Sequence, residues 1–107
     1  TTGARRWDMA PLLEEDLFLI CARARGEGPG HPRGRQLPET ITVAELVQEP
    51  LILPTGPHGL RSTLDTAFAR DRVAPHVVLE VDSLAMVMAA VDAGLGSTVQ
   101  PWAAMGR

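Results

Sequence analysis

Residues 51–65 read LILPTGPHGLRSTLD, which passes from a short apolar segment through a loop into a helical pattern. Leu51–Leu53 has the length and composition of a buried strand. The loop that follows contains two prolines and two glycines, which are typical of tight turns. Apolar residues then recur at the spacing of one helix face, at Leu60, Leu64, Ala67 and Phe68. Strand, loop and helix in succession form the building unit of an α/β domain.

Upstream of this unit, the sequence predicts a strand, a long loop and a short helix. Asp16–Ala22 is a compact apolar run of strand length. Residues 23–39 are rich in glycine, proline and arginine and predict an exposed loop. Thr42, with Glu45 three residues later, forms a capping-box pattern, so we expect a short helix that ends before Pro50.

Downstream, the sequence predicts a strand, a helix and a final strand. Val77–Val81 is the strand, and either Asp82 or Ser83 caps the helix. Gly94 suits the position just after that helix, and Leu95 is expected to make an apolar contact beyond it. Leu95 also begins the final predicted strand, which runs to Val99. The apolar stripe of the helix is expected at Leu84, Val87, Met88 and Val91.

Strands and helices therefore alternate along the chain, as in an α/β domain. We predict a mostly parallel sheet of four to five strands with helices on both faces, which makes three layers. A chain of 107 residues has room for one modest core. Trp7 and Trp102 are costly to expose, so we expect the chain to enter from, and leave toward, another packed body.

The composition is that of a globular domain with a mildly acidic surface. Apolar residues make up 45% of the chain and charged residues 21%, and the net charge is -3. An acidic domain is a poor candidate for holding nucleic acid by itself. No apolar run reaches the roughly 18 residues of a membrane span, and Thr1–Trp7 leads into no apolar signal region. We therefore expect a cytoplasmic location and no membrane partner.

The candidate binding site is the loop between Leu53 and the following helix. Ligands of open α/β sheets collect beyond the carboxyl ends of the strands, where a loop leads into a helix N-terminus. Thr55–Gly59 occupies that place, and the backbone N–H groups of residues 58–60 favour an anion or a carbonyl oxygen. Glycine allows a ligand to approach the backbone closely, while Pro57 stiffens the loop. The alternative is that these residues form only a tight turn.

Two groups of residues that contain histidine are candidates for chemical sites. His31, His58 and His76 are too widely spaced to pair as metal ligands on one helix, so we predict no metal site. The residue types of a Ser-His-Asp catalytic triad occur close together at His58, Ser62 and Asp65. The sequence has no nucleophile-elbow motif or separate oxyanion loop to accompany them. The sequence therefore predicts no catalytic residue.

Three further patterns have ordinary structural explanations. Gly94-Leu-Gly96 follows a helix rather than opening one, so it ends that helix and does not bind a dinucleotide; no cofactor is expected. Cys21 is the only cysteine and reads as a buried strand thiol rather than a reactive one. Four arginines in residues 23–35 make a positive loop, which is solvated or, in the alternative, contacts DNA or an acidic partner.

In order along the chain, the segments PLLEEDLFLI, a loop with proline and histidine, ITVAELVQEPLILP, GLRSTLDTAFA and VVLEVDSLAMVMAAVDAGLGSTVQP form one recognisable series. This series resembles the distal lobe of the effector-binding domain of LysR-type transcriptional regulators, over residues 11–101. Its most specific parts are Glu80–Ser83 followed by Val91–Gly96, and the strand, loop and helix of residues 51–64.

The resemblance implies a ligand sensor. Members of the family carry an N-terminal winged helix-turn-helix that binds DNA, followed by two α/β lobes similar to type 2 periplasmic binding proteins. A small effector binds in the cleft between the lobes. Carried over by position, the share of this lobe in the cleft is Thr55, Gly56, Pro57, His58, Gly59, Val81 and Ser83.

The resemblance also divides the chain into three parts. Residues 1–10 would be a hinge or a remnant of the first lobe, 11–101 the effector-binding lobe, and 102–107 the return crossing toward the first lobe. The DNA-binding domain and most of the first lobe are then expected outside this chain.

The prediction is therefore a ligand-sensing part of a bacterial LysR-type regulator, and not an enzyme. Its effector is a small molecule; a helix N-terminus favours a carboxylate, while amides, sugars and neutral aromatics stay open. The full-length protein would bind DNA only through its N-terminal domain and would self-associate as a dimer or tetramer. The alternative is a solute-binding protein of the periplasmic type 2 fold, which shares the lobe architecture.

Overall fold

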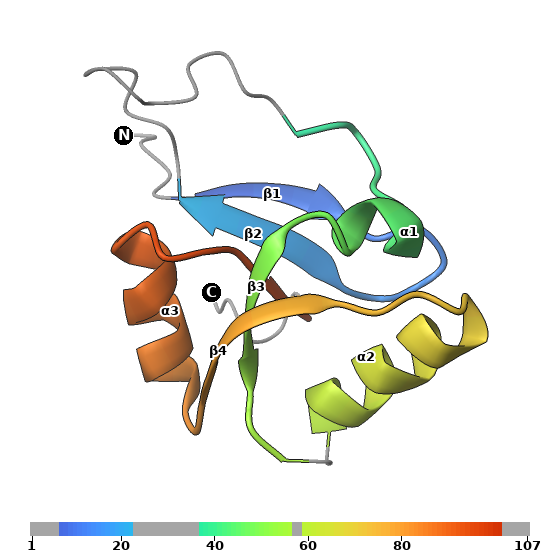
Figure 1. The fold of residues 1–107 in the computed structure, drawn as a ribbon. Coiled ribbons are helices and arrows are strands. Elements are labelled where there is room, and N and C mark those ends of the chain that lie inside the picture. The colour runs from blue at the N-terminus through green and yellow to red at the C-terminus, as the bar shows by residue number, and fades with distance from the viewer. Residues whose placement is uncertain (1–6, 23–36, 57–58, 102–107) are drawn as a thin grey trace.

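The computed structural model describes residues 7–22, 37–56 and 59–101 of the chain. Within these ranges it contains five strands and three helices (Figure 1), which confirms the predicted α/β class. In chain order they are β1 (Trp7–Pro11), β2 (Phe18–Ala22), α1 (Val43–Leu46), β3 (Pro50–Pro54), α2 (Gly59–Arg70), β4 (His76–Val81), α3 (Leu84–Asp92) and β5 (Thr98–Gln100).

The strands pair into two sheets. β3 and β4 run parallel, with Pro54 opposite Val81 at their carboxyl ends. β1, β2 and β5 form an antiparallel sheet in which β2 lies between the other two strands. The prediction of a mostly parallel sheet is therefore not confirmed. Among the described residues, parallel pairing occurs between β3 and β4 and at two isolated bridges, one between Leu12 and Ile41 and one between Leu51 and Ser97.

β1 accounts for much of this difference, because the sequence pattern predicted no strand there. The chain reverses between β1 and β2 over a short turn, in which the Leu12 N–H donates to the Leu17 carbonyl oxygen at 2.8 Å. Two strands joined by so short a turn pair antiparallel, whereas a parallel pair needs a long crossover. The predicted boundary at residue 10 falls inside β1, which pairs with β2 along its whole length.

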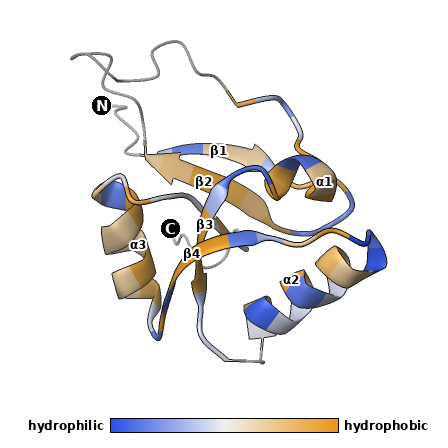
Figure 2. Cartoon of the chain, viewed as in Figure 1, coloured by the Kyte–Doolittle hydropathy of each residue, from blue (hydrophilic) through white to orange (hydrophobic). Residues whose placement is uncertain are grey.

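Helices cover both faces of β3, as expected for three layers. Leu51 and Leu53 pack on one face, in a core that includes apolar residues of α1 and α2. Ile52 packs on the opposite face, against Val87 and Val91 of α3. Figure 1 shows α2 and α3 on either side of β3, and Figure 2 shows hydrophobic residues concentrated on the strands and on α3.

The two sheets meet where β5 begins. Ser97 donates its N–H to the Pro50 carbonyl oxygen at 2.8 Å and accepts a hydrogen bond from the Ile52 N–H at 2.7 Å. The pairing of Ser97 with Leu51 is parallel, so β5 leaves this bridge in the same direction as β3. The carboxyl ends of β3, β4 and β5 therefore lie toward the same edge of the molecule.

Local signals set the helix ends as predicted. The Thr42 hydroxyl accepts from the Glu45 N–H and the Glu45 carboxylate accepts from the Thr42 N–H, both at 3.0 Å, so the capping box is confirmed. Ser83 caps α3. Gly94 follows α3 with a φ of 82°, the left-handed conformation that suits glycine after a helix.

The apolar stripe of α3 is confirmed in part. Val87 and Val91 are buried, and Met88 packs partly against the same cluster. Leu84, in the first turn, is 40% exposed, and Leu95, beyond the last turn, is 57% exposed. The buried stripe is therefore shorter than predicted, and the apolar contact expected of Leu95 leaves most of its side chain in solvent.

Trp7 is half-buried at the start of β1 and packs against the α3 cluster. Its indole N–H donates to the Asp92 carboxylate at 2.7 Å, which ties β1 to the C-terminal end of α3. The second tryptophan considered with it, Trp102, lies outside the described residues.

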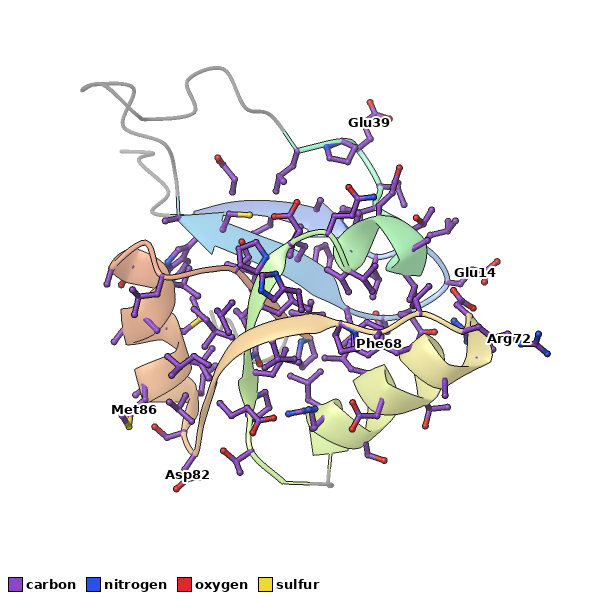
Figure 3. The ribbon with its side chains drawn as sticks, viewed as in Figure 1. Glu14, Glu39, Phe68, Arg72, Asp82 and Met86 are labelled. Carbon is purple, nitrogen blue, oxygen red and sulfur yellow. The ribbon has the colours of Figure 1, made fainter. Side chains whose placement is uncertain are left out.

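The C-terminal end of α2 offers a stabilising substitution. The Arg72 N–H donates to the Ala69 carbonyl oxygen at 3.1 Å and the Val73 N–H to that of Phe68 at 3.0 Å, a helix ending that favours glycine at position 72. Arg72 instead holds a φ of 60°, and its side chain projects into solvent (Figure 3). We expect Arg72→Gly to raise the free energy of unfolding by about 0.5–1 kcal/mol in urea denaturation, because glycine adopts this φ without strain. Arg72→Ala keeps the strained Cβ, so an equal gain in that variant would contradict the explanation.

Candidate functional site

The candidate site is the edge at which β3 and β4 end. Pro54 and Val81 lie opposite each other in the parallel register, and the Thr55 N–H donates to the Val81 carbonyl oxygen at 3.0 Å. The two strand ends are therefore fixed to each other. The loop after β3 and the turn before α3 both leave the sheet at this point, which is where ligands of open α/β sheets bind.

Within the described ranges, the β3 side of this edge carries three of the predicted ligand-binding residues. Thr55 and Gly56 are exposed directly after β3, and Gly59 is exposed at the start of α2. Gly56 has a φ of 99° and Gly59 a φ of 54°, while a Cβ built on either glycine would meet nothing within 4 Å. Backbone conformation, and not crowding, therefore favours glycine at both positions. Pro57 and His58 lie outside the described residues.

The β4 side carries the other two predicted residues. Val81 is half-buried and packs against the α3 cluster. Ser83 is exposed, and its hydroxyl accepts a hydrogen bond from the Met86 N–H at 3.2 Å, which confirms the predicted cap. Figure 3 shows the side chains of Asp82 and Met86 projecting at this end of the molecule. A ligand contact by Val81 or Ser83 stays a prediction.

Arg61 is the residue at this edge that the sequence analysis missed. Its Nη1 donates to the Pro54 carbonyl oxygen at 3.2 Å and to a Glu80 carboxylate oxygen at 2.6 Å, and its Nε donates to Asp65 at 3.2 Å. The guanidinium therefore joins the first turn of α2 to the last residues of β3 and β4. Its side chain is only 17% exposed. Of these contacts, the one with Asp65 has a sequence signal, the i,i+4 spacing of Arg61 and Asp65, which was not used.

Two carboxylates surround the Arg61 guanidinium, which is charged at neutral pH with or without them. The hydrogen bond to Glu80 is the largest cause that raises the pKa of Arg61; burial opposes it, and Asp65 adds to it. One guanidinium charge is thus shared by two carboxylate charges. Arg61 is therefore suited to bracing the loop after β3, and less suited to supplying a free positive charge to a ligand carboxylate.

Backbone hydrogen-bond donors lie instead at the start of α2. The first four N–H groups of an α-helix have no acceptor within the helix, and the helix dipole places partial positive charge there. α2 has 12 residues and no acidic side chain in its first turn. With Gly59 exposed at that turn, a carbonyl oxygen or an anion of a ligand can approach the backbone.

Other kinds of site receive no support from the described ranges. Across residues 7–22, 37–56 and 59–101, no three His, Cys, Asp or Glu side chains gather as a metal ion requires. The helices in those ranges include none that is long and apolar enough to cross a membrane. Cys21 is half-buried on β2, where its Sγ accepts a hydrogen bond from the Ser97 hydroxyl at 3.2 Å.

The described elements thus form an α/β unit whose parallel strands end at an exposed loop and a helix N-terminus. Residues 4–107 match the family described as the LysR substrate binding domain. The chain belongs to this family, as its resemblance to the effector-binding domain of LysR-type regulators predicted.

Named relatives agree with this membership. The chain is 32% identical over 90 residues to the nitrogen assimilation regulatory protein nac of Escherichia coli (strain K12), an alignment covering 84% of this chain and 26% of that protein. It is 30% identical over 88 residues to the HTH-type transcriptional activator CmpR of Synechocystis sp., covering 82% of this chain and 26% of the activator. The chain therefore spans about a quarter of the length of these curated relatives.

Proposed function

We propose that this chain is the effector-sensing lobe of a LysR-type transcriptional regulator. One observation carries the proposal: the carboxyl ends of β3 and β4 meet at an exposed loop and a helix N-terminus. The chain that shows this arrangement belongs to the LysR substrate binding domain family. The names of the relatives, a regulatory protein and a transcriptional activator, favour a regulator over a periplasmic solute-binding protein.

In this proposal the chain is one lobe of a type 2 periplasmic-binding-protein-like fold, and a second lobe closes the cleft. The effector contacts are Thr55, Gly56, Gly59, Val81 and Ser83. Pro57 and His58 complete the set. The effector carries a carboxylate or another acceptor group that receives hydrogen bonds from the N-terminus of α2.

The proposed mechanism is a shift between two arrangements of the lobes. An effector that contacts both lobes stabilises one relative orientation, and it changes DNA binding only to the extent that it binds that orientation more tightly. DNA binding belongs to a separate winged helix-turn-helix, and self-association as a dimer or tetramer carries the change between subunits. The protein works in the cytoplasm and catalyses no reaction.

A thermal-shift screen of the full-length protein tests this proposal. We expect some small carboxylate, amino acid or aromatic acid to raise the melting temperature, since a ligand at about 100 times its Kd stabilises by roughly 2.7 kcal/mol. In Thr55→Ala, the same ligand should give a clearly smaller shift. Thr40→Ala, an exposed threonine away from this edge, is the matched control and should respond like the parent.

Two outcomes would count against the proposal. If the ligand stabilises Thr55→Ala as well as it stabilises the parent, the loop after β3 is only a turn and the pocket lies elsewhere. If no compound shifts the melting temperature or changes operator binding in a gel-shift assay, the sensor function itself is not supported.

A further inference from the structure

β5 ends in a buried polar pair within a mostly apolar fold. Thr98 is fully buried and Gln100 is 5% exposed. The Gln100 Nε2 donates to the Thr98 hydroxyl oxygen at 3.3 Å. Burying an amide costs free energy unless its hydrogen-bonding groups find partners, so a nearly buried glutamine requires an explanation.

The contact with Thr98 satisfies only part of this amide. A glutamine side chain offers two N–H donors and a carbonyl oxygen with two lone pairs. In the part of the chain that the structure describes, the bond to Thr98 is the one side-chain hydrogen bond that Gln100 makes, which leaves its Oε1 without a donor. Leaving such an acceptor unsatisfied costs free energy.

Gln100 lies toward the same edge as the candidate site. The bridge between Leu51 and Ser97 sets β3 and β5 in the same direction. β3 ends at Pro54 and β5 ends at Gln100, each three residues beyond the bridged pair. The last residue of β5 therefore lies toward the edge from which the loop after β3 leaves.

The side chain of Gln100 also lies on the face of the sheet that α3 covers. Val99 packs in the core with Leu51, so by the alternation of a strand its neighbours Thr98 and Gln100 point to the opposite face. That face is the one on which Ile52 packs against α3. α3 begins at the same edge, directly after the carboxyl end of β4.

We propose that the Gln100 carboxamide, held in place by Thr98, accepts a hydrogen bond from an N–H or O–H group of the effector. This inference rests on the proposed effector site and narrows its ligand class. The effector then carries two features: an acceptor for the N-terminus of α2 and a donor for Gln100. Amino acids, hydroxy acids and amides have both.

The test uses matched pairs of compounds that differ in one donor group, with the full-length protein. The pairs are lactate and propionate, 4-hydroxybenzoate and benzoate, and alanine and propionate. We expect the donor-bearing member of at least one pair to raise the melting temperature of the parent more than its partner does. In the double variant Thr98→Val, Gln100→Met that difference should disappear, with affinity for the donor-bearing compound falling about tenfold or more.

The double variant also separates ligand recognition from a structural role. Replacing both partners of a buried hydrogen bond by apolar groups of similar shape is nearly neutral or stabilising, so without ligand the variant should melt no lower than the parent. A large loss of melting temperature would show that the pair is structural and would overturn the proposal. Gln48→Met, which changes an exposed glutamine after α1, is the matched control and should respond to ligand like the parent.

The remaining outcomes also decide the question. If a compound stabilises the parent and the double variant equally while Thr55→Ala loses the response, the sensor function stands and the role of Gln100 is wrong. If the donor-bearing compounds never exceed their partners, the proposed ligand class is wrong.

Discussion

Gly96→Ala is expected to lower the free energy of unfolding by about 1–3 kcal/mol, toward the upper end of that range, because the added methyl group has no space. A Cβ at Gly96 would lie 2.7 Å from the Pro50 carbonyl oxygen and 3.3 Å from two side-chain carbons of Ile52. The Pro50 oxygen also accepts the hydrogen bond from Ser97 that joins β5 to β3. Relief of the clash would therefore disturb the junction of the two sheets. Urea denaturation of the chain measures the loss.

Gly94, two residues earlier, provides a control with a different mechanism. A Cβ at Gly94 would meet nothing within 4 Å, but its φ of 82° disfavours other residues, so Gly94→Ala should cost about 1 kcal/mol. Asparagine tolerates this conformation better than alanine does. Gly94→Asn should therefore recover part of the loss, while Gly96→Asn should be at least as damaging as Gly96→Ala. A milder effect at Gly96 than at Gly94 would contradict the steric account.

The features that the sequence predicted well are those fixed by neighbouring residues. The capping box of Thr42 and Glu45, the cap at Ser83 and the glycine after α3 each involve groups a few residues apart. The apolar runs that became β3 and β4 were also visible, because both strands are short and contain several large aliphatic residues.

The predicted parallel direction of most strands is not confirmed, because pairing joins residues far apart in the chain and the sequence pattern does not show it. β5 pairs antiparallel with β2, which places Val99 opposite Leu19. The residues of β1, WDMAP, show neither a continuous apolar run nor a proline-free strand pattern, so β1 was not predicted. β1 forms a strand because it pairs with β2 along its whole length, and not because of its own composition.

The candidate site, like the fold, could be predicted from the sequence only in part. The sequence located the loop after β3 through its glycines and prolines and its place before a helix. It could not show that Arg61 reaches Pro54 and Glu80, because only the fold brings α2 against the ends of both strands. The burial of Gln100 was likewise not predicted, since composition does not show whether a polar side chain is buried.

Arg61→Met is expected to lower the free energy of unfolding by about 1–2 kcal/mol and to weaken effector binding. The guanidinium is mostly buried and donates hydrogen bonds to a carbonyl oxygen and two carboxylates. The stabilisation from these bonds should therefore exceed the small contribution of an exposed ion pair. Glu80 and Asp65 are about half exposed, so water compensates part of the loss. Without this brace the loop after β3 loses its fixed position. We expect about tenfold weaker binding of any ligand found in the screen, equivalent to about 1.4 kcal/mol.

Two further variants decide whether Arg61 positions the loop or merely adds charge. Arg61→Lys keeps the charge, but a single ammonium cannot reach three acceptors in the directions that the planar guanidinium serves, so it should recover little of the binding. Arg70→Met removes an arginine from the other end of α2, where it pairs with Glu15 and Asp71, and should leave ligand affinity unchanged. Full recovery of binding by Arg61→Lys would mean that the ligand responds to charge at this position. In that case Arg61 would contact the effector electrostatically, and the brace between α2 and the two strands would not be what holds the site.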